Sequence, residues 1–170
     1  VREAKLAVLG SETHYWDYGP ADAPLTIVAV HGFRGDHHGL EALVVQLDGI
    51  RVISPDLPGF GISTPMVGRT HDIDAYAEWL GAFIDGLGLA KRPVVLGHSF
   101  GSIVVSAALA RGLGAPSVIL VNPIAAPALK GPKAFLTSLA VFYYWLGAKL
   151  PAAIGGPLMG SRLITRGISE

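Results

Sequence analysis

The regular alternation of short apolar runs with stretches of helical spacing most constrains how this chain folds. Thr26–Val30 is an almost continuous apolar run, and residues 94–96 and 118–121 form similar runs. Gly, Pro or Asp bounds each run, and the first run is typical of a strand buried on both faces of a parallel sheet. The chain therefore predicts an α/β fold in which βαβ units build a mostly parallel sheet flanked by helices.

Local patterns predict where the individual elements lie. Residues 6–9 and 14–18 predict an opening hairpin, and residues 51–54 predict a further short strand. Asp72 or Asp74 can cap a helix that presents apolar side chains on one face. That face comprises Tyr76, Leu80, Phe83, Ile84 and Leu87. Helices are also expected over residues 40–47, 102–112 and 134–150.

The composition excludes several classes of function. Hydrophobic residues make up 51% of the chain and charged residues 15%, an apolar balance that excludes disorder. Thirteen Lys and Arg residues balance thirteen Asp and Glu residues, and no basic run supplies the charge that binding nucleic acid requires. Because the chain has no cysteine, it offers no thiolate nucleophile, disulfide or CxxC metal site.

No segment predicts a stable membrane span. The uncharged, apolar-rich stretch over residues 134–148 is shorter than the roughly 20 residues needed to cross a bilayer. The first residues lack the basic and then apolar pattern of a secretory signal, so the cytoplasm is the expected compartment. The sequence leaves the oligomeric state open.

Gly97-His98-Ser99-Phe100-Gly101 lies where an apolar run turns into an alanine-rich stretch. A strand that turns abruptly into a helix exposes the residue at its tip, and the sharp turn requires very small residues two positions before and after it. Gly97 and Gly101 occupy those positions around Ser99. The N–H groups that open the helix, beginning with that of Phe100, point toward negative charge forming nearby. Because this pattern also occurs by chance, its context decides its meaning.

Two further motifs precede this turn. His31-Gly32-Phe33 follows the first apolar run, and Pro55-Asp56-Leu57-Pro58-Gly59-Phe60-Gly61-Ile62-Ser63 follows the next strand. In order and placement, the three motifs resemble the oxyanion loop, the DxxGxG-type loop and the nucleophile elbow of the α/β-hydrolase family. The resemblance covers residues 6–126 and implies a serine-nucleophile hydrolase of the capped, esterase- or lipase-like branch.

The resemblance assigns roles to three residues. It implies that Ser99 is the nucleophile and that the backbone N–H groups of Phe33 and Phe100 are the oxyanion donors. Removing one such donor typically costs about 10²- to 10³-fold in kcat. The two phenylalanine rings are expected to shape the acyl pocket, with core packing as the alternative. Haloalkane dehalogenases and epoxide hydrolases use an aspartate as nucleophile, so Ser99 favours acyl chemistry.

Other polar residues near these motifs are expected to be structural. His98 is a neighbour of the nucleophile in sequence, but adjacent side chains on a turn point in different directions, so packing is expected rather than catalysis. His31 is expected to secure the oxyanion loop by hydrogen bonding. His37 and His38 resemble half a metal site without a third ligand at suitable spacing, so no metal is predicted. Asp56 follows a strand, and the resemblance assigns it to a structural loop that supports the rim of the site.

The catalytic triad cannot be completed within this sequence. The family order is serine, acid and then histidine, whereas no His follows His98 and no Asp or Glu lies between Asp85 and Glu170. We expect residues 1–126 to form the amino-terminal part of the hydrolase core and residues 127–170 to begin a helical cap. The acid and histidine are then expected beyond this sequence, and the chain alone should be nearly inactive. A decayed homologue that binds without catalysis is the alternative.

The prediction is therefore a serine hydrolase that cleaves an ester, thioester or related acyl substrate through an acyl-enzyme at Ser99, without a cofactor. A small hydrophobic acyl substrate is the expected partner. An apolar face of the 134–150 helix would line its pocket or simply pack within the cap. That face comprises Phe135, Leu139, Phe142, Tyr143 and Leu146. Cofactor-free haloperoxidases, carbon–carbon hydrolases and lyases share the framework, and a noncatalytic binding or interaction protein is a further alternative.

Overall fold

The computed structural model describes residues 1–124 and 134–151. The chain divides into two compact units, Val1–Ile124 and Ala125–Glu170. The first unit, here called the core, contains these elements in chain order: β1 (Arg2–Val8), β2 (Ser11–Tyr18), β3 (Thr26–Val30), η1 (His37–Leu40), α1 (Glu41–Val44), β4 (Arg51–Pro55), α2 (Ile73–Gly86), β5 (Val94–His98), α3 (Phe100–Ala110) and β6 (Val118–Val121). The second unit contributes α4 (Ala134–Lys149). The predicted boundary after residue 126 lies outside the described residues.

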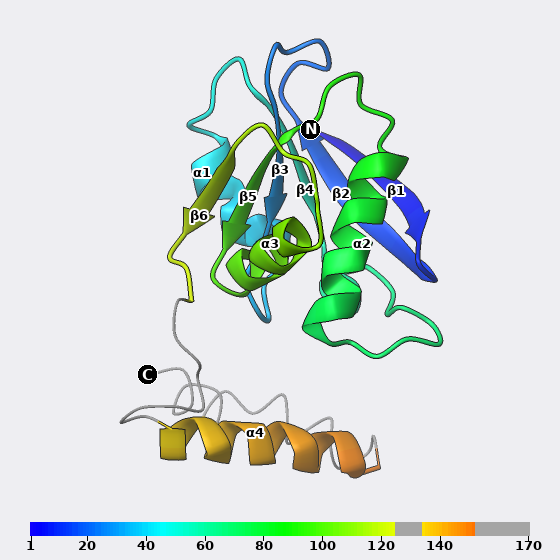
Figure 1. Ribbon diagram of the computed structural model, residues 1–170, viewed down its shortest axis with the longest axis vertical. Helices are drawn as coiled ribbons and strands as arrows, with labels where there is room; N and C mark the ends of the chain where they lie inside the picture. The colour runs from blue at the N-terminus through cyan, green and yellow to red at the C-terminus, as the bar shows by residue number, and fades with distance from the viewer. Residues whose placement is uncertain (125–133, 152–170) are drawn as a thin grey trace. The chain divides into compact units, whose positions relative to one another are not determined.

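A six-stranded sheet runs through the core in the order β1-β2-β4-β3-β5-β6. β1 pairs antiparallel with β2 and β2 with β4, while β4, β3, β5 and β6 run parallel. Helices α2 and α3 cover one face, and the short segments η1 and α1 cover the other (Figure 1). This arrangement confirms the predicted fold class. Because parallel strands end at the same edge, the residues that follow them, including His31, Asp56 and Ser99, gather there.

The opening hairpin is confirmed and is longer than predicted. Val8 pairs with Ser11 across a two-residue turn. Leu9 and Gly10 in this turn have φ angles of 47° and 82°. Positive φ at both central residues suits the right-handed twist of the strands that such a turn joins. Because β2 also pairs with β4, the hairpin extends the parallel strands at one side of the sheet.

Asp17 fastens the hairpin to the parallel strands. Its carboxylate accepts two hydrogen bonds from Arg51, both at 2.9 Å, and one from Arg2 at 3.3 Å. Burial acts to raise the pKa of Asp17, but the hydrogen bonds and charges of Arg51 and Arg2 outweigh it and hold that pKa below its usual value. Sequence reasoning missed this cluster, because its members lie 15 and 34 residues apart along the chain.

Asp72, and not Asp74, caps helix α2. The backbone of Asp72 is extended, and its carboxylate accepts the Ala75 N–H at 2.9 Å. The predicted apolar face packs into the core, with its last member half-buried: Tyr76, Leu80, Phe83, Ile84 and Leu87. Trp79 is also fully buried, and its indole N–H donates to Thr13 Oγ1 at 3.0 Å. This hydrogen bond ties α2 to β2.

The helix predicted over residues 40–47 is instead two short pieces, η1 and α1. Asp36 caps the first piece by accepting the His38 N–H at 3.0 Å, so helical structure begins earlier than predicted. Gly49, with a φ of 73°, then turns the chain toward β4. Helix α3 also begins earlier than predicted, at Phe100, because the turn at Ser99 opens directly into it.

Helix α4 confirms the helix predicted in the second unit. Its exposed apolar side chains extend beyond the predicted face: Phe135, Leu139, Val141, Phe142 and Trp145. The apolar surface of α4 is therefore wider than the predicted stripe. Among the described residues, no helix is long and apolar enough to cross a membrane.

Candidate active site

Ser99 lies at the tip of the turn from β5 into α3. Its backbone angles, φ 51° and ψ −114°, belong to a region that side-chain-bearing residues rarely adopt, at a cost of about 1–3 kcal/mol. The Ser99 N–H donates to Val121 O at 3.0 Å. Its carbonyl oxygen accepts the Ser102 N–H at 2.9 Å and the Ser102 hydroxyl at 2.5 Å. Hydrogen bonds on both sides of the residue thus hold the strained turn.

Gly97 and Gly101 flank Ser99 because the backbone passes close to both. A Cβ on Gly97 would stand 2.5 Å from the carbonyl oxygen of Gly101. A Cβ on Gly101 would stand 2.7 Å from the carbonyl oxygen of His31. Backbone carbonyls cannot move aside as the end of a flexible side chain can. The prediction that the turn requires very small residues at these positions is confirmed.

Ser102 supports the turn from within α3, and sequence reasoning missed it. The residue is only 2% exposed. Its hydroxyl donates to the Ser99 carbonyl and accepts the Ile124 N–H at 3.2 Å. Ser102 therefore connects the turn to the segment after β6. Its place three residues after Ser99, from which a hydroxyl can reach back to the backbone, is the only sign of this role in the sequence.

The loop after β3 lies against the turn. A Cβ on Gly32 would lie 3.2 Å from both Ser99 Cβ and Nδ1 of the His98 ring. The rings of Phe33 and Phe100 meet edge to face, with their centroids 5.9 Å apart. The structure therefore brings together the three residues that the sequence predicts for the site: Ser99, Phe33 and Phe100.

His31 is buried at the start of this loop and is 1% exposed. Its Nδ1 lies 2.8 Å from Gly32 O, and because a carbonyl can only accept, Nδ1 carries the proton. Its Nε2 accepts the Leu57 N–H at 2.9 Å. Burial lowers the pKa of His31 below its usual value and so favours the neutral ring. The prediction that His31 secures the loop by hydrogen bonding is confirmed.

Asp56 is 1% exposed and fixes the loop after β4. Its carboxylate accepts three hydrogen bonds, from His37 N–H at 2.9 Å, His37 Nδ1–H at 3.0 Å and Ile62 N–H at 3.0 Å. Gly61, with a φ of 52°, packs so closely on this carboxylate that a Cβ would overlap it. These contacts confirm the structural role predicted for Asp56.

Asp36 lies beside His37 and His38 and is a third potential metal ligand, which the sequence pattern did not indicate. Asp36, His37 and His38 offer potential ligand atoms within 4.8 Å of one another. However, His37 Nδ1 is bonded to Asp56, and its ring stacks on Trp16 with the centroids 3.2 Å apart. Asp36 in turn accepts the backbone N–H of His38 as the cap of η1. These groups already hold the loop, so their geometry favours a structural role over metal binding.

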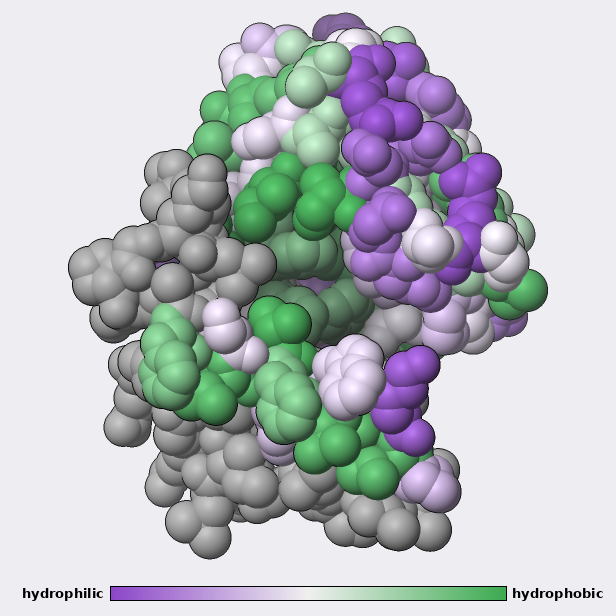
Figure 2. Space-filling view, turned by 60° about the horizontal axis from the view of Figure 1, so that its bottom comes forward, coloured by the Kyte–Doolittle hydropathy of each residue, from purple (hydrophilic) through white to green (hydrophobic). Residues whose placement is uncertain are grey.

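An apolar pocket of about 480 Å³ opens beside Phe33 and Phe100. Phe60 and Tyr76 complete its aromatic wall. The ring centroids are 5.7 Å apart for Phe33 and Phe60, 6.4 Å for Phe60 and Tyr76, and 5.7 Å for Tyr76 and Phe100. Figure 2 turns this end of the core toward the viewer and shows hydrophobic side chains gathered beside a hydrophilic flank.

Two polar groups of this pocket have partners in the protein. The Tyr76 hydroxyl donates to Pro58 O at 2.9 Å. His71 Nε2 accepts the Met66 N–H at 3.1 Å. Among the described residues, no Asp, Glu, Lys or Arg lines the pocket. A bound group would therefore meet mainly ring faces and ring edges.

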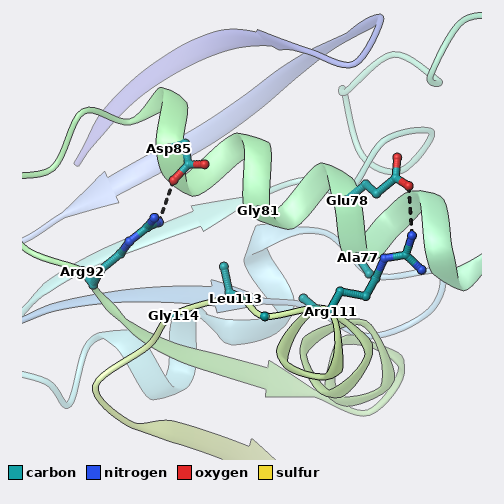
Figure 3. Close-up of a pocket in the computed structure, with 10 residues that line it drawn as sticks. Ala77, Glu78, Gly81, Asp85, Arg92, Arg111, Leu113 and Gly114 are labelled. Carbon is teal, nitrogen blue, oxygen red and sulfur yellow. Dashed lines mark hydrogen bonds and ion pairs between the residues drawn. The ribbon is translucent and has the colours of Figure 1, made fainter.

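A second hollow, of about 290 Å³, lies between α2 and the turn after α3 (Figure 3). Two ion pairs border it, Arg92 with Asp85 at 2.6 Å and Arg111 with Glu78 at 3.1 Å. All four side chains are exposed, so water and salt screen these pairs and they contribute little energy. No residue of the turn at Ser99 lines this hollow.

Within the described part of the chain, no histidine nitrogen is hydrogen-bonded to Ser99 Oγ. His31 uses both of its ring nitrogens elsewhere, and His37 Nδ1 is held by Asp56. The His98 ring lies beside Gly32. His31 and His37 thus secure loops, and the expectation that His98 is not the catalytic base stays a prediction.

The fold and the turn at Ser99 together define the class of this protein. Residues 26–152 match the alpha/beta hydrolase fold family, and the chain belongs to that family. Among curated proteins it is similar to Methylesterase 10 of Arabidopsis thaliana, with 37% identity over 70 residues, and to Lipase 3 of Moraxella sp. strain TA144, with 32% identity over 78 residues. These matches cover 41% and 46% of this chain but only 26% and 25% of the relatives.

Solved structures share the fold at lower identity. A membrane phospholipase A matches with a TM-score of 0.70 and 22% identity, over 92% of this chain and 56% of the other. The N-acyl homoserine lactonase AidH matches with a TM-score of 0.67 and 22% identity, over 80% of this chain and 53% of the other. At this identity the likeness establishes the fold alone. The chain spans little more than half the length of these structures.

Proposed function

We propose that this protein is a serine hydrolase that cleaves an ester or a related acyl substrate. The observation that carries the proposal is the strained backbone of Ser99, held between β5 and α3 with the His31-Gly32-Phe33 loop against it. Stored strain of this kind is typical of functional sites. The names of the curated relatives, which include a methylesterase and lipases, support the same class of reaction.

In the proposed mechanism, Ser99 Oγ attacks the substrate carbonyl carbon while its proton passes to a histidine base. The carbonyl oxygen becomes an oxyanion and accepts hydrogen bonds from the N–H groups of Phe33 and Phe100. When this intermediate collapses, the alcohol or thiol leaves with the proton from the histidine, and the acyl group remains on Ser99. Water, deprotonated by the same base, then releases the acid and restores the serine. No step requires a metal or cofactor.

The proposed mechanism requires a histidine base and an acidic partner for it. All six histidines of this sequence lie at or before His98. Within the described residues, none of them is hydrogen-bonded to Ser99 Oγ. We therefore propose that an acid and a histidine beyond this sequence complete the triad, in the family order. Removal of the triad histidine costs about 10⁶-fold in kcat in a well-studied serine protease, so the chain alone is expected to be nearly inactive.

The aromatic pocket supports a small hydrophobic acyl group as substrate. Its lining carries no formal charge among the described residues, and the Tyr76 hydroxyl and His71 Nε2 are already bonded. A carboxylate placed there would lose water without gaining a charged partner. For the full-length protein, we expect kcat/KM for 4-nitrophenyl butyrate to exceed kcat/KM for 4-nitrophenyl hemisuccinate, which carries a carboxylate, by roughly tenfold or more. Equal values for the two esters would exclude this pocket as the acyl site.

Phosphonylation tests the nucleophile directly. The full-length protein is treated with a fluorophosphonate, and the modified peptide is identified by mass spectrometry. We expect modification at Ser99 and its loss in Ser99→Ala. Ser106→Ala is the matched control, because Ser106 lies in the same helix and its hydroxyl only bonds back to Ser102 O at 2.8 Å. A folded protein that stays unmodified, or one that is labelled equally in Ser99→Ala, would overturn the proposal.

A further inference from the structure

His31 joins the two loops that border the site. Its ring accepts the N–H of Leu57 from the loop after β4 and donates to the carbonyl of Gly32 in the loop after β3. Leu57 directly follows Asp56, whose carboxylate holds His37 and Ile62. The two loops are thus joined by a chain of buried hydrogen bonds centred on the 1%-exposed ring of His31.

The Gly32 carbonyl also fixes the direction of the next N–H group. A peptide unit is planar, and the described peptide bonds include no cis bond, so the N–H of Phe33 points opposite to the oxygen of Gly32. Two donors hold that oxygen, His31 Nδ1–H at 2.8 Å and Gly35 N–H at 3.1 Å. Whatever orients this carbonyl therefore orients the Phe33 N–H, which is the proposed oxyanion donor.

Only one protonation state of His31 fits these contacts. Nδ1 must carry a proton to donate to Gly32, and Nε2 must carry none to accept from Leu57. A second proton would place two N–H donors against each other across the 2.9 Å between Nε2 and the Leu57 nitrogen. The charged ring keeps its Nδ1 donor but must move away from the Leu57 N–H, and the Gly32 carbonyl that it holds then moves with it.

We propose that His31 is a positioning residue whose neutral Nδ1–H tautomer aligns the Phe33 N–H with Ser99, and that protonation of its ring in acid releases this alignment. The proposal rests on the proposed function for the role of the Phe33 N–H. The titratable groups that act on the ring are Asp56, Asp36 and His37. Burial, which has the largest effect, and His37 disfavour the charged ring, whereas the hydrogen bond to Gly32 and the two carboxylates favour it.

Imidazole ¹⁵N spectroscopy of the unmodified protein tests the geometry without needing activity. At pH 8 we expect the resonances of His31 to be those of a neutral ring protonated at Nδ1, with the exposed His38 as the reference. When acid protonates His31, the backbone amides of Phe33 and Leu57 should shift with the same midpoint. A ring protonated at Nε2 at pH 8, or protonation that leaves the Phe33 amide unchanged, would overturn the proposal.

Phosphonylation rates test the link to Ser99. His31→Ala should slow labelling of Ser99 by about 10- to 100-fold, somewhat less than the loss of a whole oxyanion donor. His31→Asn should recover most of this loss, because its amide nitrogen can occupy the position of Nδ1 and donate to Gly32 O. In the unsubstituted protein, protonation of His31 in acid should slow the labelling of Ser99. His31→Asn should lose this pH dependence. His38→Asn is the matched control and should behave as the unmodified protein.

The outcomes separate this inference from the proposed function. If Ser99 is labelled equally fast in all His31 variants, the positioning role is wrong and the proposed function stands. If the protein without any substitution is not labelled at Ser99 at all, the proposed function is wrong. The spectroscopic result alone then decides whether His31 orients the Phe33 amide. Should His31→Ala fail to fold, His31→Asn and the spectroscopy still decide the matter.

Discussion

At the scale of single residues, the glycines around Ser99 give the sharpest prediction. Gly97→Ala would bring a Cβ within 2.5 Å of the Gly101 carbonyl oxygen, so the turn has to shift. We expect the free energy of unfolding to fall by roughly 1–3 kcal/mol and phosphonylation of Ser99 to be lost. Urea denaturation measures the first effect and mass spectrometry the second.

Gly81→Ala is the matched control for that substitution. Gly81 lies inside α2 beside the open hollow in Figure 3, and an added Cβ would meet no atom within 4 Å. Because alanine is the better helix former, stability should rise by about 0.5–1 kcal/mol, with labelling unchanged. Equal destabilisation by the two substitutions would contradict the steric account of the turn.

Asp56 gives a second prediction at this scale. Asp56→Asn replaces a carboxylate oxygen with an NH₂ group that would face a backbone N–H, so a buried donor loses its acceptor. We expect a loss of about 1–3 kcal/mol in the free energy of unfolding, measured with urea. Asp48→Asn, at an exposed position, should change it by less than about 0.5 kcal/mol. If Asp56→Asn is as harmless as Asp48→Asn, the carboxylate does not hold the loop as described.

Sequence patterns predicted the residues of the site that depend on local geometry. Gly97, Gly101 and Ser99 follow from the steric needs of a single turn. The pairing of His31 with Leu57 and that of Asp56 with His37 did not follow, because each joins two different loops, across 26 and 19 residues of the chain. Such pairings depend on how the strands are ordered in the sheet, and no short window of sequence contains that order.

At the scale of elements, the cap of α2 can be tested. Asp72→Ala removes the acceptor of the Ala75 N–H and should lower the free energy of unfolding by about 1 kcal/mol. Asp74→Ala removes only an exposed pair with Arg111 and should cost less. Thermal denaturation of the two variants side by side makes the comparison. A larger loss from Asp74→Ala would contradict the assignment of the cap.

Strands were easier to predict than short helices. β3 lies where its apolar run predicts, because burial on both faces leaves a clear sequence pattern. The prediction of a single helix over residues 40–47 was wrong, since the chain forms two short helical pieces there. Four apolar residues at helical spacing do not determine where a helix begins. The cap at Asp36 sets where the helical segment begins, and Gly49, with its positive φ, turns the chain toward β4. The apolar spacing predicts neither.

At the scale of the whole core, stability should decline in acid. The pKa of His31 is lowered from 6.5, mainly by burial, so its contribution to stability is complete above pH 6.5 and is lost as the pH falls below it. Burial acts to raise the pKa of Asp17, but the two arginines outweigh it and lower that pKa from 3.8. The contribution of Asp17 to stability is therefore lost only as the pH falls below 3.8. We expect the free energy of unfolding to fall in both ranges.

Urea denaturation at pH 7.5, 5.5 and 3.5 measures this decline. Comparison with His31→Asn isolates the part of the decline that is due to His31, because asparagine does not titrate. The difference in stability between the two proteins should shrink as the pH falls from 7.5 to 5.5. A difference that stays constant over this range would mean that His31 is not held neutral in the folded core.

A crystal structure of the full-length protein after reaction with a fluorophosphonate would show directly which residue is the nucleophile. We predict a phosphorus–oxygen bond to Ser99 Oγ. The phosphoryl oxygen should lie about 2.7–3.1 Å from the backbone nitrogens of Phe33 and Phe100. An adduct on another residue, or a phosphoryl oxygen directed away from both nitrogens, would contradict the assignment of Ser99 as the nucleophile beside this oxyanion site.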